Sequence, residues 1–218
     1  MKLLNSTTTT LCGIAVGLLA ASAPAQAANL VWGSSFDLGL TGSDNNDCSG
    51  YFGQGFENCE VNGSPVIAKI DYLEDGSSEW ETNSMFPSIT GIEWTFDDDG
   101  AASGTWTYTK NDPADPDIRY WVAKGGDGFN LFYHIADGAD AAACSGAAAF
   151  STECLQQAIV STTGEWFTPV NPNNDRNFGL SHLTFYDTKE SVPEPATIFG
   201  LGAIALASRF LRRKSDDA

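Results

Sequence analysis

Basic residues are scarce in this sequence: 11 lysines and arginines stand against 28 aspartates and glutamates, which gives a formal net charge of −17. A surface of this charge repels the phosphates of nucleic acids and anionic lipid headgroups. We therefore expect no nucleic-acid partner. Acidity of this degree also favours solubility and can attract divalent cations.

Histidine is nearly absent too, with only His134 and His182 in the chain. The sequence has no Gly-x-Ser-x-Gly, no His-Glu-x-x-His and no glycine-rich phosphate loop ahead of a helix. If their strands paired, the two histidines could act with a carboxylate as a base or a metal site. Hydrogen-bonded sheet histidines are the preferred interpretation, so we predict no enzyme and no catalytic residue. A secreted hydrolase would need a converging histidine–carboxylate or paired-carboxylate cleft.

No apolar run reaches the roughly 20 residues of a stable membrane-spanning helix, but a short one lies near each end. Near the N-terminus, Lys2 is followed by an apolar segment over residues 11–21 and by a small-x-small pattern at Ala25 and Ala27. This order is typical of a secretory signal peptide. We predict that residues 1–27 form one and that signal peptidase cleaves after Ala27.

The C-terminal apolar segment has a more specific arrangement. It begins with a two-proline hinge, continues as an apolar stretch to Ser208 and ends in a basic cluster. The hinge and the cluster comprise Val192, Pro193, Glu194 and Pro195, and Arg209, Arg212 and Arg213. The apolar stretch is marginal for a span, and the cluster would hold its far end on the cytoplasmic side. These features favour transient insertion of a short C-terminal helix into the membrane.

These three features together resemble the PEP-CTERM sorting tail of bacterial surface proteins. The resemblance covers residues 191–214 and implies that an exosortase-type membrane protease recognises Pro193, Glu194 and Pro195. It also implies export to the cell envelope, the cell surface or the medium after transient anchoring, and a role in the extracellular matrix or biofilm. The acidic end, Ser215 to Ala218, departs from the pattern and weakens its positive charge slightly.

Cysteines are few, and Cys12 lies within the predicted signal peptide. The other four are Cys48, Cys59, Cys144 and Cys154. An even number in an exported chain indicates disulfides. Four cysteines allow three connectivities, and the spacings favour two local bridges, Cys48–Cys59 and Cys144–Cys154. Zinc is the alternative, but the chain has no Cys-x-x-Cys pair to support it.

Residues 28–190 are predicted to form one acidic domain rich in β-strands. Period-two or β-branched and aromatic patterns predict strands over residues 66–73, 92–96, 105–109, 118–124, 129–135 and 180–186. The pair 118–124 and 129–135 flanks Gly125 to Gly128 and predicts a hairpin with a longer loop. Only residues 139–159 could hold a helix. We therefore predict a mainly β fold, an antiparallel β-sandwich of the jelly-roll or Ig-like kind.

Two roles for this domain stay open besides the hydrolase. A non-enzymatic structural or adhesive role is the leading interpretation. A polysaccharide-binding module is the alternative, because exposed tryptophans could stack on sugars, whereas buried ones would form a core. The tryptophans are Trp32, Trp80, Trp94, Trp106, Trp121 and Trp166.

Cofactors are not predicted, although three oxygen-rich loops offer the hard ligands that calcium prefers. They lie at residues 44–47, 97–99 and 112–117. None has the EF-hand spacing, and solvated turns are the preferred interpretation.

Overall fold

The structure is a computed structural model that describes residues 28–73, 75–97 and 100–188. The predicted signal peptide and sorting tail lie outside these residues. Within them every strand pair is antiparallel, and the helices are single turns. The expectation of a mainly β, antiparallel fold is confirmed, whereas the jelly-roll or Ig-like strand order stays a prediction.

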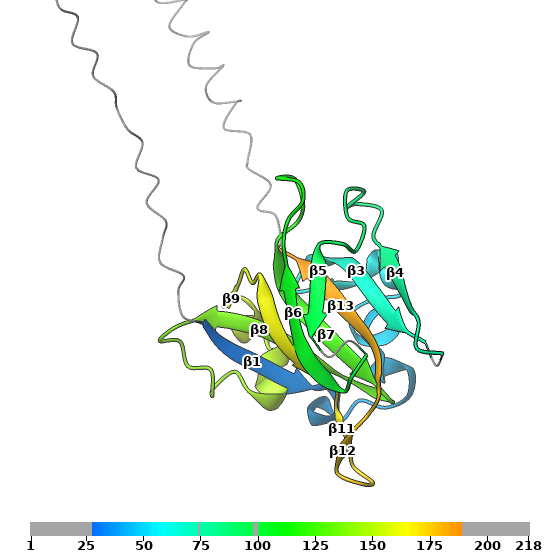
Figure 1. Ribbon diagram of the computed structural model, residues 1–218. Coiled ribbons are helices and arrows are strands. Elements are labelled where there is room, and N and C mark those ends of the chain that lie inside the picture. Colours follow the sequence, from blue (N-terminus) through cyan, green and yellow to red (C-terminus); the bar gives the residue numbers. More distant parts are fainter. Residues whose placement is uncertain (1–27, 74, 98–99, 189–218) are drawn as a thin grey trace, which may run out of the picture.

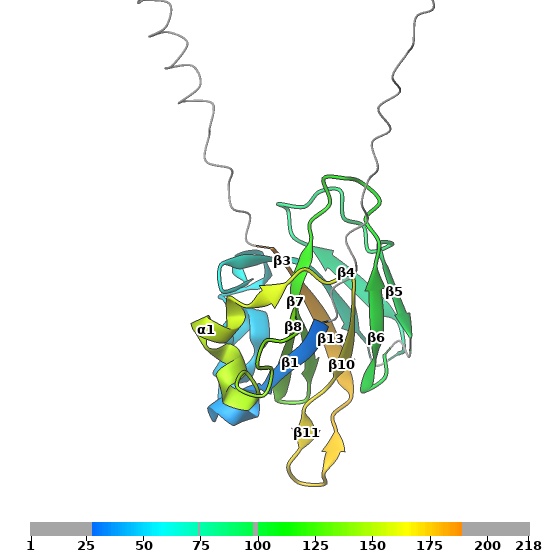
Figure 2. The same ribbon diagram turned by 90° about the vertical axis from the view of Figure 1, so that its left-hand side faces the viewer.

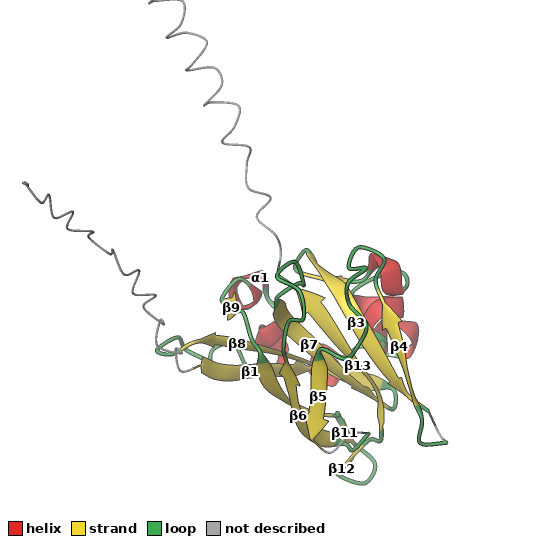
Figure 3. Ribbon diagram, turned by 45° about the horizontal axis from the view of Figure 1, so that its top comes forward, coloured by secondary structure: helices red, strands yellow, loops and turns green. Residues whose placement is uncertain are grey.

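A large sheet forms the middle of the molecule, and it curls into a half-barrel (Figures 1 and 3). Its main path runs β1–β8–β7–β13–β3–β2, with β4 added beside β3 and β9 beside β8. The bounds are β1 (Ala28–Ser34), β8 (Gly128–Ala136), β7 (Ile118–Gly125), β13 (Leu180–Asp187), β3 (Ser64–Tyr72), β2 (Glu60–Val61), β4 (Ser78–Thr82) and β9 (Ala158–Ile159).

A smaller sheet covers one face of the large one. Its order is β10–β6–β5, and a short hairpin of β11 and β12 follows β10. The bounds are β10 (Thr163–Phe167), β6 (Ser103–Tyr108), β5 (Trp94–Asp97), β11 (Val170–Asn171) and β12 (Arg176–Asn177).

Short helical turns cover the opposite face, so the molecule has three layers (Figure 2). They come from two loop regions, one after β1 and one after β8. The bounds are η1 (Ser35–Leu38), η2 (Gly42–Asn45), η3 (Asp47–Tyr51) and η4 (Phe56–Asn58) in the first region, and η5 (Gly146–Phe150) and α1 (Thr152–Leu155) in the second.

The three layers enclose two hydrophobic cores, one on each face of the large sheet. Alternate residues of a strand point to opposite faces, and β8 shows this directly: Leu131 and Tyr133 join the core under the helical turns, whereas Phe132 joins the core under the small sheet. Both faces of the large sheet are therefore shielded from water. Double coverage explains why β7 carries the continuous buried run Tyr120–Ala123 instead of a polar alternation.

Two disulfides hold the helical turns together, Cys48–Cys59 and Cys144–Cys154. These are the two local pairs that the spacing favours. All four cysteines are at least 94% buried and belong to the core on this face of the sheet. The bridges thus order two loop regions that contain little regular structure.

Each predicted strand coincides at least in part with an observed one. The hairpin of residues 118–135 is present as β7 and β8, but its loop is shorter than predicted. Gly125 pairs with Gly128, which leaves only Gly126 and Asp127 in the turn. Gly126 has φ of +55°, a conformation that glycine adopts without strain and that a tight two-residue turn requires.

Candidate functional site

A buried polar cluster in the described residues centres on the carboxylate of Asp47. Asp47 begins η3 and precedes Cys48, so the Cys48–Cys59 bridge anchors it beside the large sheet. Its exposed fraction is 1%. A buried charge is costly unless it is paired and hydrogen-bonded, so its partners decide whether the loop is stable.

His182 and Thr184 supply those partners from β13. Nε2 of His182 lies 3.0 Å from both oxygens of Asp47, and the Thr184 hydroxyl donates to Oδ2 at 2.9 Å. The two residues are two apart in the strand and so share a face. Tyr186 continues that face, and its hydroxyl lies 3.5 Å from Cys48 Sγ and 3.3 Å from Cys59 Sγ.

These contacts set the charge state of the cluster. Burial alone would raise the pKa of Asp47, but His182 and the hydrogen bonds from the Cys48 backbone and Thr184 outweigh it and hold that pKa well below its usual range. Lys124 of β7 lies opposite His182 of β13 in the sheet. Burial lowers the pKa of Lys124, and the negative charge of Asp47 partly offsets this effect. Asp47 is therefore an anion at neutral pH.

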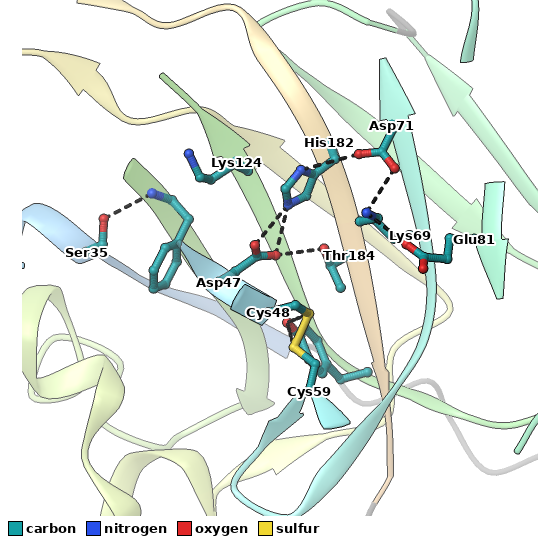
Figure 4. Close-up of polar contacts among 12 residues, drawn as sticks. Ser35, Asp47, Cys48, Cys59, Lys69, Asp71, Glu81, Lys124, His182 and Thr184 are labelled. Carbon is teal, nitrogen blue, oxygen red and sulfur yellow. Dashed lines mark hydrogen bonds and ion pairs between the residues drawn. A yellow bond between two sulfur atoms is a disulfide. The ribbon is translucent and has the colours of Figure 1, made fainter. Parts of the chain in front are cut away.

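The cluster continues from the interior to the surface through three neighbouring strands (Figure 4). His182 opposes Asp71 of β3, and its Nδ1 lies 3.7 Å from the carboxylate. Lys69 of the same strand bridges Asp71 at 3.0 Å and Glu81 of β4 at 2.9 Å. Burial opposes the charge of Lys69, yet its two acidic partners prevail and raise its pKa. Acidic side chains thus alternate with His182 and Lys69 along the cluster.

This geometry suits a clamp between loop and sheet. Both oxygens of Asp47 contact internal partners. On the other side of the His182 ring, Nδ1 faces the carboxylate of Asp71 and not a hydroxyl or thiol nucleophile. Both His182 and Asp47 are at least 91% buried. The histidine–carboxylate pair that a hydrolase would need is present, but it faces inward.

The two histidines do not converge. His134 lies on β8, which β7 separates from the β13 strand of His182. Their side chains also lie on opposite faces of the sheet, because the His134 ring packs on Trp121 and its Nδ1 lies 2.8 Å from the Ser161 hydroxyl. His134 is thus a hydrogen-bonded sheet residue, as preferred from the sequence. Burial lowers its pKa.

The two buried carboxylates of the candidate calcium loops, those of Asp47 and Asp115, are engaged by internal partners. Asp47 binds His182, and Asp115 accepts hydrogen bonds from the Ser88 hydroxyl and from the backbone of Asn111 and Asp112. Asp98 and Asp99 lie outside the described residues. No group of three or more metal-ligating side chains occurs in the part of the chain that the structure describes.

Most tryptophans form the core instead of an exposed row. Trp94, Trp106, Trp121 and Trp166 are at least 95% buried between the two sheets. Trp106 packs edge-on against Trp121, with ring centroids 5.1 Å apart. Trp80 is partly buried and packs against the same core, whereas Trp32 has an exposed fraction of 40%.

The predicted cleavage residues, Ala25 and Ala27, lie outside the described residues. So does every predicted sorting residue: Val192, Pro193, Glu194, Pro195, Arg209, Arg212 and Arg213. Over residues 28–73, 75–97 and 100–188, no helix has the length and apolarity that crossing a bilayer requires.

Comparison with known proteins identifies the C-terminal segment. Searches of curated proteins and of solved structures return no match. Among protein families, residues 191–214 match the PEP-CTERM protein-sorting motif. The matched residues coincide with the hinge, apolar stretch and basic cluster seen in the sequence. This chain therefore carries a PEP-CTERM protein-sorting motif, which implies export and processing by an exosortase.

Proposed function

We propose that the domain is a non-enzymatic structural or adhesive component of the cell surface or extracellular matrix, delivered there by its sorting tail. The PEP-CTERM match over residues 191–214 is the observation that carries the routing. Two disulfides support the same destination, because such bridges persist in oxidising compartments.

The architecture of the domain supports a passive role. Its large sheet is covered on both faces, and its main ionisable cluster is a buried clamp around Asp47. The net charge of −17 favours a hydrated surface that repels its own copies. A stable acidic module of this type suits display at the surface better than turnover of a substrate.

Deletion of Pro193 to Pro195 tests the routing in an exporting host that has an exosortase. We expect the deleted form to stay in the membrane fraction, because the protease no longer recognises the hinge while the apolar stretch and basic cluster still retain the chain. Immunoblots of membrane, surface and medium fractions measure this. Deletion of Ser215 to Asp217, beyond the basic cluster, is the matched control and should leave release unchanged. Normal release of the form without Pro193 to Pro195 would contradict the sorting proposal.

A further inference from the structure

A small pocket lies between β1 and the segment that joins β10 to β11. Its volume is about 230 Å³. Three aromatic rings and a valine form its apolar part, and four polar residues complete it. The lining residues are Trp32, Phe36, Phe167 and Val170, with Ser34, Asp37, Asn130 and Thr168.

Trp32 stands at this pocket as a fixed and partly exposed aromatic surface. It is 40% exposed, the most of the six tryptophans. Its ring packs edge-on against Phe167 with centroids 4.9 Å apart, and Phe167 in turn packs edge-on against the buried Phe132 at 5.0 Å. The core therefore holds the indole in place, while a flat apolar area stays open to a ligand.

A buried hydrogen-bond acceptor lines the same pocket. Asn130 is 99% buried, and its Nδ2 donates to the Phe167 carbonyl at 2.9 Å. That bond fixes the orientation of the amide and leaves Oδ1 without a hydrogen-bond partner. An unpaired buried acceptor destabilises the protein, and a hydrogen-bond donor from a ligand would offset that cost.

The charge of the pocket and of the whole chain limits the class of ligand further. Asp37 is the one ionisable residue that lines the pocket, and one of its oxygens accepts from the Ser34 backbone at 3.1 Å. The site thus presents acceptors to a ligand, and the chain has a net charge of −17. Both features disfavour an anionic ligand, and the acceptors suit a ligand rich in hydroxyl donors.

We propose that this pocket binds one ring of a neutral polysaccharide, with an apolar face of the sugar on Trp32 and hydroxyl groups donating to Asn130 and Asp37. The volume is below the roughly 300–1,000 Å³ of sites for drug-sized molecules, which suits a single ring. This inference deepens the adhesive role and rests on it, but it is independent of the sorting tail.

Saturation-transfer NMR on the full-length chain tests the proposal, in a detergent without a sugar headgroup. The probes are cellohexaose and maltohexaose as neutral chains and polygalacturonate as an anionic chain. We expect binding of at least one neutral probe and none of polygalacturonate. Trp32→Ala should weaken that binding at least tenfold, whereas Trp32→Phe should retain most of it. Ile92→Ala is the control, because Ile92 is 77% exposed and lies outside the pocket.

Thermal unfolding of each variant separates loss of the ligand from loss of the fold. If Trp32→Ala is unstable, Val170→Asp replaces it. Val170 lines the pocket and is 50% exposed, so the introduced carboxylate would stay in contact with water and the fold should persist. Failure of both neutral probes to bind overturns the proposal, and so does wild-type affinity in a folded pocket variant. Either failure leaves the fractionation result of the sorting test intact, so the two proposals fail separately.

Discussion

Asp47→Ala is expected to lower the free energy of unfolding by about 3–5 kcal/mol, since breaking a buried pair leaves its partners uncompensated. The substitution removes the acceptor of the Thr184 hydroxyl and the close carboxylate of His182. Both partners are more than 90% buried, so water cannot replace what is lost. Asp47→Asn keeps the shape of the side chain and should cost less.

Urea unfolding of the disulfide-intact chain at several pH values measures this effect. Because the pKa of Asp47 is lowered on folding, its contribution is present above the unfolded pKa of about 3.9 and declines as pH falls below it. The gap between wild type and Asp47→Asn should therefore be present above about pH 4 and shrink as the pH falls below it. Asp137→Ala, at an exposed position, is the matched control. A loss of unfolding free energy below about 1 kcal/mol for Asp47→Ala would contradict the clamp. So would a difference between wild type and Asp47→Asn that does not change with pH.

Removal of the Cys48–Cys59 bridge by serine substitution should cost about 2–5 kcal/mol. The bridge closes a separation of eleven residues, and its sulfurs accept from the buried Tyr186 hydroxyl. It also holds Cys48, the neighbour of Asp47, against the sheet. We therefore expect its loss and the loss of Asp47 to be coupled and not additive.

A double-mutant cycle measures that coupling, with the unfolding free energy of each single and combined variant. Cys144–Cys154 provides the control, because it closes a similar separation of ten residues in the other loop region. Its removal should add to Asp47→Asn within about 0.5 kcal/mol, as distant sites do. If the unfolding free energies of the Cys48–Cys59 variant and Asp47→Asn were also additive within about 0.5 kcal/mol, the bridge and the clamp would act separately.

The sequence predicted the long strands well because their period-two patterns are strong. It missed the edge strand β1 beside the predicted cleavage site, and it missed β4 and β10, whose polar sequences Ser78–Thr82 and Thr163–Phe167 include only one or two aromatic residues each. It also gave no sign that both faces of the large sheet are covered. That coverage depends on two disulfide-closed loops that have no regular periodicity of their own.

The clamp was only half predictable. Residues 180–186 are a predicted strand, and the alternation of a strand places Thr184 and Tyr186 on the face of His182, where the structure has them. Asp47 is 135 positions away, and local patterns do not report such pairing. Its place beside Cys48 was the available signal, because a disulfide-anchored loop must pack against something. The Trp32 pocket was hidden for the same reason, since exposure of each tryptophan depends on tertiary packing.

Intact mass of the protein recovered from the cell surface and medium tests the central claim most directly. Export followed by exosortase sorting predicts a product that begins at Ala28, ends near Pro193 to Pro195 and lacks the four hydrogens of two disulfides. A recovered product that retains the complete C-terminus to Ala218 would contradict the account, because the tail would then be an ordinary anchor.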